Sequence, residues 1–114
     1  MITLYGISNC DTIKKTRKWL DEHAVEYHFH DYKKAGCSPT LIRQFLQHFS
    51  YHDLINTRGT TWRKLTDSIK TQLNTKSAIE LMSTQPSIIK RPLLQQEEDW
   101  SIGYDETRLL QLID

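Results

Sequence analysis

Residues 1–31 follow the pattern strand, helix, strand, and this pattern constrains the fold more than any other feature of the chain. In MITLYG and again in VEYHFHD, apolar side chains recur at every second position, which is the period of a strand. Between these segments, TIKKTRKWLDEH carries Ile13, Thr16 and Leu20 at helical spacing, with Trp19 beside them. This order predicts a βαβ unit with two parallel strands and a right-handed crossover.

The middle of the chain is predicted to be helical. KKAGCSP forms a turn, after which Ser38 or Thr40 begins a helix. The apolar residues of that helix are Leu41, Phe45, Leu46 and Phe49. Residues 51–65 fit no single regular element, and two short helices are predicted after them, at residues 66–72 and 76–84.

The last part of the chain returns to strands. SIIK, LLQQ and WSIG are short apolar segments that predict strands, with Pro92 between the first and the second. A helix capped by Asp105 closes the chain and carries Leu109, Leu110 and Ile113 on its inward face. The order βαβ, helices, ββα predicts an α/β fold with a mixed sheet, and a length of 114 residues fits one domain.

Charge and cysteine content exclude several classes of protein. A net charge of +1 argues against bulk electrostatic binding to nucleic acid or to a membrane. No basic leader precedes the first strand and no apolar run reaches the ~18 residues of a membrane span, so we expect a cytoplasmic protein. Cys10 and Cys37 are then reduced thiols, too few for a thiolate zinc site. His28 and His30 share a strand face without a third ligand, so no metal site is predicted.

Cys10 stands between the first strand and the first helix, where backbone N–H groups lack partners within the helix. Those amides and the helix dipole favour a thiolate and can bind an anion, and Lys14 adds positive charge. Asn9 and Asp11 flank the cysteine. Asp11 or Thr12 can cap the helix, but the charge of Asp11 would raise the pKa of the thiol, and the sequence leaves open whether this charge or the helix dipole prevails. Position alone also permits a half-buried cysteine without chemistry.

Two distant segments supply basic residues and a proline. NTRGTTWRK contains Arg58 and Arg63, and SIIKRP contains Lys90 and Arg91. A single arginine is usually solvated, but Arg91 lies at the edge of a predicted strand and directly precedes Pro92. A proline there can hold a cis peptide bond and turn the backbone toward a neighbouring loop.

Three segments together, YGISNCDTIKKTRKWL, TRGTTWRKL and PSIIKRPLL, resemble the arsenate reductase (ArsC) family, specifically its YffB/Spx-like branch. The match runs in order over essentially the whole chain. The resemblance implies one thioredoxin-like (glutaredoxin-like) domain, 1–114, with a helical insertion at about residues 38–85 between its βαβ and ββα halves. It also implies Cys10 as the redox nucleophile, Arg91 as an anion-binding residue and Pro92 as a cis-proline that faces the cysteine loop.

The chain departs from the pattern of glutathione-linked arsenate reductases at positions that hold the oxyanion. The resemblance implies a histidine just upstream of the cysteine, where this chain has Gly6, and three arginines around the oxyanion. Arg91 matches one arginine. Asn56 stands at the second position, with Arg58 two residues on, and Gly103 stands near the third. Lost donors weaken an oxyanion site by about 2.7–4 kcal/mol each, so efficient arsenate reduction is not expected.

The chain also differs from Spx-type regulators, which carry Cys–X–X–Cys and contact RNA polymerase. Ile13 stands where the second cysteine would be, so an adduct on Cys10 needs another thiol to resolve it. Glutathione is the natural candidate. Cys37 remains open as a resolving thiol, because the sequence does not give its distance from Cys10.

These observations predict a monomeric, glutathione-dependent thiol oxidoreductase with a single nucleophilic cysteine and no bound cofactor. Cys10 is the expected nucleophile, and the residues expected to bind glutathione or another anion are Arg58, Arg91, Lys14, Asn9 and Asp11. The alternatives are a Spx-like regulator or adaptor that binds RNA polymerase, and a true arsenate reductase.

Overall fold

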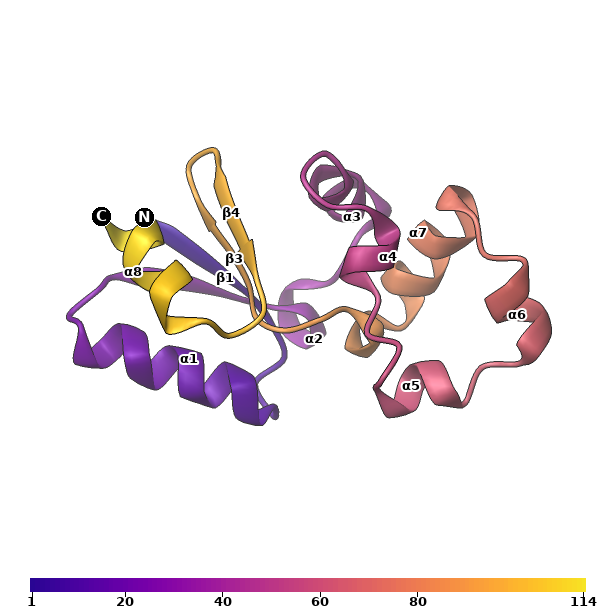
Figure 1. The fold of residues 1–114 in the computed structure, drawn as a ribbon, viewed down its shortest axis with the longest axis horizontal. Coiled ribbons are helices and arrows are strands. Elements are labelled where there is room, and N and C mark those ends of the chain that lie inside the picture. Colours follow the sequence, from indigo (N-terminus) through magenta and orange to yellow (C-terminus); the bar gives the residue numbers. More distant parts are fainter. The chain divides into compact units, whose positions relative to one another are not determined.

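A computed structural model describes residues 1–114, and the chain forms two compact units (Figure 1). The first unit combines Met1–Gly36 with Arg91–Asp114, and the second is Cys37–Lys90. The range predicted as an insertion, about residues 38–85, lies inside the second unit.

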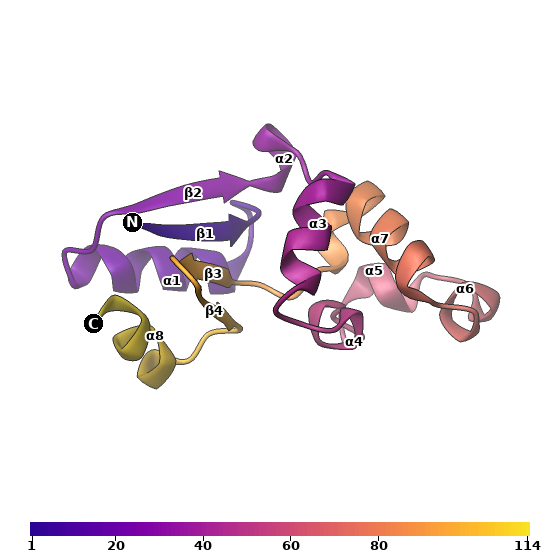
Figure 2. The same cartoon turned by 90° about the horizontal axis from the view of Figure 1, so that it is seen from above.

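The first unit is built on a four-stranded sheet in the order β2-β1-β3-β4 (Figure 2). β1 (Ile2–Gly6) pairs in parallel with β2 (Tyr27–Asp31) and antiparallel with β3 (Leu93–Gln96). β3 pairs antiparallel with β4 (Asp99–Ile102). Parallel and antiparallel pairs in one sheet confirm the predicted mixed α/β fold.

Two helices of the first unit cover one face of this sheet. α1 (Asp11–Glu22) and α8 (Glu106–Ile113) share one buried apolar cluster with the sheet, whereas the short α2 (Tyr32–Ala35) follows β2. The buried members of the cluster are Ile2, Leu4, Ile13, Trp19, Leu20, Leu94, Leu109 and Leu112. The inward face predicted for the first helix is confirmed, with Thr16 fully buried beside the apolar residues.

The inward face of α8 differs from the prediction. Asp105 caps the helix as expected, because its carboxylate accepts hydrogen bonds from two N–H groups of the first turn. Leu109 is buried as predicted, but Leu110 is 49% exposed and Leu112 is buried in its place. Both choices satisfy helical spacing in a two-turn helix, so packing against the sheet decides between them.

The second unit is helical, as predicted. Its helices are α3 (Pro39–Leu46), α4 (Tyr51–Leu54), α5 (Thr60–Arg63), α6 (Asp67–Thr71) and α7 (Thr75–Thr84). Four of them begin at a residue whose side-chain oxygen accepts a hydrogen bond from a backbone N–H three residues on: Ser38, Ser50, Thr66 and Asn74. Such caps matter here because helices of one to three turns are marginal by themselves. No helix of the chain is long and apolar enough to cross a bilayer.

Two predictions for the second unit are wrong. The strand predicted at SIIK begins as a 3₁₀ helix, η1 (Pro86–Ile88), and only an isolated antiparallel bridge joins Ile89 to Ile55. Pro86 lacks the N–H group that a strand ladder needs, and it fits the first turn of a helix well. The predicted inward face of α3 omitted Ile42, which is fully buried.

Candidate active site

Cys10 is itself the N-cap residue of α1. Its backbone is extended (φ −148°, ψ 128°), and the helix begins at the next residue, Asp11. The carbonyl of Cys10 accepts the first hydrogen bond of the helix, from the N–H of Lys14 at 3.0 Å. No side chain caps this helix, so the prediction that Asp11 or Thr12 caps it is wrong. The N–H groups of the first turn therefore lie next to the sulfur without a capping side chain.

Two side chains contact the sulfur of Cys10, which is half-buried. Nε of Arg91 donates a hydrogen bond to Sγ at 3.3 Å, and Oγ1 of Thr12 lies 3.2 Å from the same atom. The Arg91–Pro92 peptide bond is cis, the conformation that we expected there. The N–H of Gly103 donates to the carbonyl of Pro92 at 2.8 Å, which ties this loop to the end of β4. The sequence indicated Thr12 only as a possible helix cap and not as a contact of the sulfur, although its place in the first helical turn after the cysteine could have suggested that contact.

Hydrogen bonds outweigh burial at Cys10, and the pKa of its thiol is lowered from its ordinary value. Burial is the largest single influence and by itself raises the pKa. The Thr12 hydroxyl, the N–H of Ile13 and the Arg91 guanidinium favour the thiolate, and together they lower the pKa. The sequence left open whether the helix start or the charge of Asp11 prevails at the thiol. The lowered pKa of Cys10 shows that its surroundings favour the thiolate, although Asp11 is adjacent.

Cys37 lies in a very different environment. It is buried, with only 8% of its surface exposed, and burial raises the pKa of its thiol to about 12. The carbonyl of Cys37 accepts a hydrogen bond from Oγ of Ser83 at 2.9 Å, which joins the backbone of Cys37 to α7. A thiol with this pKa is almost fully protonated near neutral pH, so Cys37 is poorly suited to attack an adduct on another cysteine.

Comparison with known proteins decides the family. The model of the ArsC family matches residues 5–112, which include both segments that meet at Cys10. This chain belongs to the ArsC family. An uncharacterized protein of Haemophilus influenzae is 41% identical over 106 residues, and the match covers 93% of each chain. A protein of Streptococcus agalactiae named global transcriptional regulator Spx is 32% identical, with 96% of this chain and 80% of the relative covered.

Solved structures place the chain in the YffB/Spx-like branch of the ArsC family. A structure described as YFFB protein superposes with a TM-score of 0.94 at 41% identity and covers 100% of both chains. An arsenate reductase (ArsC) related protein from Brucella melitensis is also 41% identical, with a TM-score of 0.81 and coverage of 96% of this chain and 92% of its own.

Gly6 marks a departure of this ArsC-family chain from the arsenate reductase pattern, and a side chain at this position would overlap Ile13. A Cβ atom at residue 6 would lie 2.4 Å from Cδ1 of Ile13 and 3.8 Å from Cδ of Arg91. Ile13 is fully buried, so it has little room to move. A histidine at residue 6 would therefore have to displace Ile13, and in this chain the donors to the sulfur come from α1 and from Arg91.

The other predicted site residues fall into two groups. Asn9, Asp11 and Lys14 are close neighbours of Cys10 in sequence at the start of α1, and their side chains are exposed. Arg58 belongs to the second unit, where its side chain is exposed and its N–H donates to Oδ1 of Asn56 at 3.1 Å. The first group shares a helix start with Cys10, whereas the role of Arg58 stays a prediction.

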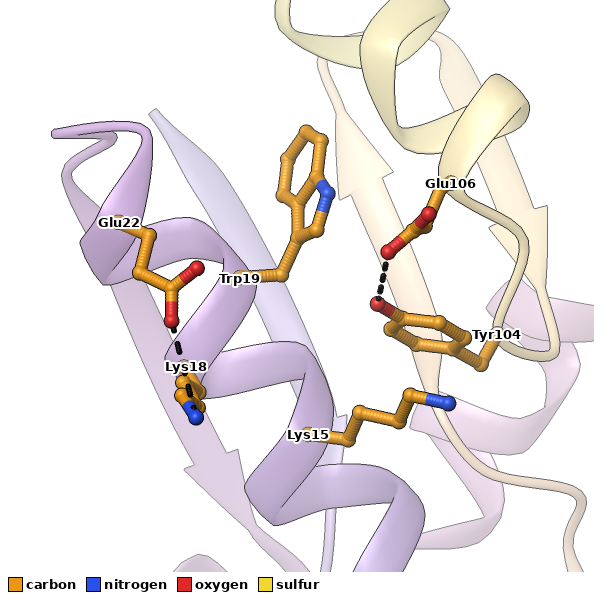
Figure 3. Close-up of a pocket in the computed structure, with 6 residues that line it drawn as sticks. All are labelled: Lys15, Lys18, Trp19, Glu22, Tyr104 and Glu106. Carbon is orange, nitrogen blue, oxygen red and sulfur yellow. Dashed lines mark hydrogen bonds and ion pairs between the residues drawn. The ribbon is translucent and has the colours of Figure 1, made fainter.

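A separate pocket of about 210 Å³ lies between α1 and the start of α8 (Figure 3). It is lined by Lys15, Lys18, Trp19, Glu22, Tyr104 and Glu106. Nζ of Lys15 lies 4.6 Å from the centre of the Tyr104 ring, and the Tyr104 hydroxyl donates to Glu106 at 3.0 Å. The polar groups of this pocket thus bind one another, and Cys10 does not line it. No group of three or more His, Cys, Asp or Glu side chains is placed to hold a metal ion.

Proposed function

We propose that this ArsC-family protein is a glutathione-dependent thiol reductase that uses Cys10 as its single nucleophile. One observation carries the proposal: the Cys10 sulfur lies at the start of α1 and accepts a hydrogen bond from Arg91 at 3.3 Å. This contact favours the thiolate, which is the nucleophilic form of cysteine.

The proposed reaction has two thiol–disulfide exchanges. The Cys10 thiolate attacks the glutathione sulfur of a glutathionylated thiol, so a new disulfide forms on Cys10 and the substrate leaves as a thiolate. A glutathione thiolate then attacks the glutathione sulfur of that adduct. Oxidised glutathione is released and the Cys10 thiolate is regenerated. The net reaction turns the glutathionylated thiol and one glutathione thiolate into the substrate thiolate and oxidised glutathione. The substrate sulfur leaves with the electron pair of the broken S–S bond and then takes up a proton, and the incoming glutathione sulfur is oxidised to the disulfide level.

External glutathione is needed because the chain offers no suitable second thiol. Residue 13 is isoleucine, and Cys37 is buried with its pKa raised to about 12. An adduct on Cys10 therefore awaits a thiolate from solution.

Charged and backbone groups around Cys10 suit the carboxylates of glutathione. We propose that Arg91 and Lys14 attract them, and that the backbone N–H groups of Asp11 and its neighbours in the first turn of α1 donate to them. Asn9 precedes the cysteine and adds a side-chain donor. Arg58 is proposed to bind a second carboxylate. We place the reaction in the cytoplasm, where glutathione keeps thiols reduced, and propose that the protein acts as a monomer.

A thiol-transfer assay tests the proposal. Purified protein is mixed with a glutathionylated peptide and reduced glutathione, and oxidised glutathione is measured through the NADPH consumed by glutathione reductase. C37S serves as the matched control for C10S. The proposal predicts that C37S keeps the activity and that C10S falls to the uncatalysed rate. Full activity in C10S would refute it.

A regulatory role is the second candidate, because the Streptococcus agalactiae relative at 32% identity is named a transcriptional regulator. Under this alternative the chain is an adaptor that binds RNA polymerase, and Cys10 is a redox sensor. Retention of RNA polymerase on the immobilised protein, together with no activity in the thiol-transfer assay, would favour the regulator. Arsenate reduction is the weakest candidate. The histidine that the arsenate reductase pattern has near the cysteine is Gly6 here, and Ile13 occupies the space beside it.

A further inference from the structure

Thr12 and Arg91 contact the sulfur of Cys10 from two different segments of the chain. Its Oγ1 lies 3.2 Å from Sγ of Cys10, a short distance for a hydrogen bond that involves sulfur. Arg91 approaches the same atom from the loop that precedes β3, whereas Thr12 approaches from the first turn of α1. Two segments that are far apart in sequence thus place donors on one sulfur.

The direction of the Thr12 contact depends on the protonation state of Cys10. A thiol can donate its S–H to the hydroxyl oxygen, and this is a weak hydrogen bond. A thiolate can only accept, so the hydroxyl of Thr12 must then donate to it. A hydrogen bond to a charged acceptor is roughly twice as strong as one between neutral groups. The contact therefore favours the thiolate.

The hydroxyl of Thr12 is not used to build the helix. No side chain caps α1, and the residue that bonds back to the preceding turn is Thr16, whose Oγ1 donates to the carbonyl of Thr12 at 2.7 Å. Thr16 is fully buried and packs in the core, and no contact joins it to the Cys10 sulfur. The two threonines are thus one helical turn apart but have different partners.

We propose that Thr12 is a positioning residue for the reaction, whose hydroxyl donates to the Cys10 thiolate and holds the sulfur ready to attack. This inference deepens the proposed function and rests on the role given there to Cys10 as nucleophile. Thr12 and Arg91 are the side-chain donors seen at the sulfur, and residue 6 is a glycine that offers no side chain. The lowered pKa of the Cys10 thiol agrees with this arrangement.

The charged groups around the sulfur are few within the first unit. Arg91 faces it from the loop before β3, and the exposed side chains of Asp11 and Lys14 belong to the same helix start. These groups are unchanged in every Thr12 variant below. A difference between variants therefore reports on the hydroxyl.

The test is the pH profile of alkylation of Cys10 by iodoacetamide in a C37S background, for T12V, T12S and T16V. T12V keeps the branched shape without the hydroxyl, whereas T12S keeps the hydroxyl without the methyl group. T16V removes a hydroxyl from the same helix without touching the sulfur, so it is the matched control. Circular dichroism confirms that each variant is folded.

We expect T12V to raise the pH at half-maximal rate by about one unit, which is an up to tenfold slower reaction near neutral pH. T12S and T16V are expected to stay within about 0.3 units of the parent. The inference is overturned if T12V superposes on the parent, if T12S shifts as far as T12V, or if T16V does so. The profile needs no glutathione. If T12V shifts the alkylation profile but the parent protein has no thiol-transfer activity, the role of Thr12 at the thiolate is supported and the proposed function is rejected.

Discussion

Cys10 and Cys37 carry the same thiol in two regions of the molecule and differ in what surrounds the sulfur. Cys10 is half-buried at the start of α1, where two side chains contact its sulfur and its pKa is lowered. Cys37 is buried at the start of the second unit, and burial raises its pKa to about 12. Burial acts in the same direction at both sites, so the hydrogen bonds to the sulfur separate them.

The comparison shows why a cysteine alone does not define a redox site. Removing a thiolate from water disfavours it at either position. At Cys10 the Thr12 hydroxyl, the Ile13 N–H and the Arg91 guanidinium offset this loss. No hydrogen bond counters burial at Cys37, where desolvation alone raises the pKa of the thiol. Reactivity therefore follows from donors that the fold brings to one sulfur.

The largest expected effect is the selectivity of alkylation. At pH 7.5 a thiol with a pKa of about 12 is ionised to less than about one part in ten thousand, whereas the lowered pKa of Cys10 leaves a far larger fraction of its thiol ionised. We expect Cys10 to react at least about a thousandfold faster than Cys37 in the folded protein. Quantitative mass spectrometry of the two cysteine peptides after timed iodoacetamide treatment measures the ratio. Comparable alkylation rates would contradict the difference in ionisation between the two thiols.

Stability at alkaline pH gives the next effect. The folded-state pKa of Cys37 lies above its unfolded value, so its contribution to stability is complete below pH ~8.5 and is lost as the pH rises toward about 12. By pH 10 the loss is about 2 kcal/mol in the free energy of unfolding. Urea titrations at pH 8 and pH 10 measure it. C37A should lack this part of the loss and C10S should retain it; an equal loss in C37A would contradict the raised pKa.

Removing Arg91 should bring Cys10 closer to an ordinary thiol. R91A deletes both a hydrogen bond and a positive charge from the sulfur, so we expect the pKa of Cys10 to rise by about one unit. R91K keeps the charge but not the directed Nε–H, and an intermediate shift is expected. The ultraviolet absorbance of the thiolate, followed against pH in a C37S background, measures both variants. An unshifted titration in R91A would show that Arg91 does not stabilise the thiolate.

The smallest effect concerns the packing beside Cys10. G6A puts a methyl group against Cδ1 of Ile13, and I13V removes that atom. Each single variant is expected to lower the free energy of unfolding by about 1 kcal/mol. The double variant should lose about 1 kcal/mol less than the sum of the two single losses, because valine at residue 13 lacks the Cδ1 atom that the methyl group at residue 6 would overlap. Chemical denaturation of the four proteins completes the cycle, and strict additivity would mean that Gly6 and Ile13 do not compete for space.

Local sequence patterns predicted much of the first unit correctly. Ile13, Thr16 and Leu20 lie at helical spacing on a long, strongly amphipathic helix, so their burial followed from the period of three to four residues. The predictions for short helices and strands were less accurate. Leu110 and Leu112 both fit an inward face in α8, and SIIK is too short to distinguish a strand from a helical turn. Packing and the missing N–H of Pro86 decided these cases.

The candidate site was predictable only in part. Cys10 and the cis Pro92 were expected from the resemblance, but Arg91 is 81 positions from Cys10 along the chain, and no spacing rule gives that contact. Asp11 looks like a cap because aspartate favours that position, yet the chain enters the helix one residue earlier. Thr12 was considered only as a cap, because a threonine at the start of a helix commonly has that role, and its contact with the Cys10 sulfur was not predicted.

The pH dependence of Cys10 alkylation in a C37S background, with and without glutathione, tests the central claim most directly. The account predicts an apparent pKa below the ordinary value of ~8.5 and slower alkylation when glutathione is present. An apparent pKa at or above ~8.5, with no protection by glutathione, would contradict it, because the start of α1 would then not activate its cysteine.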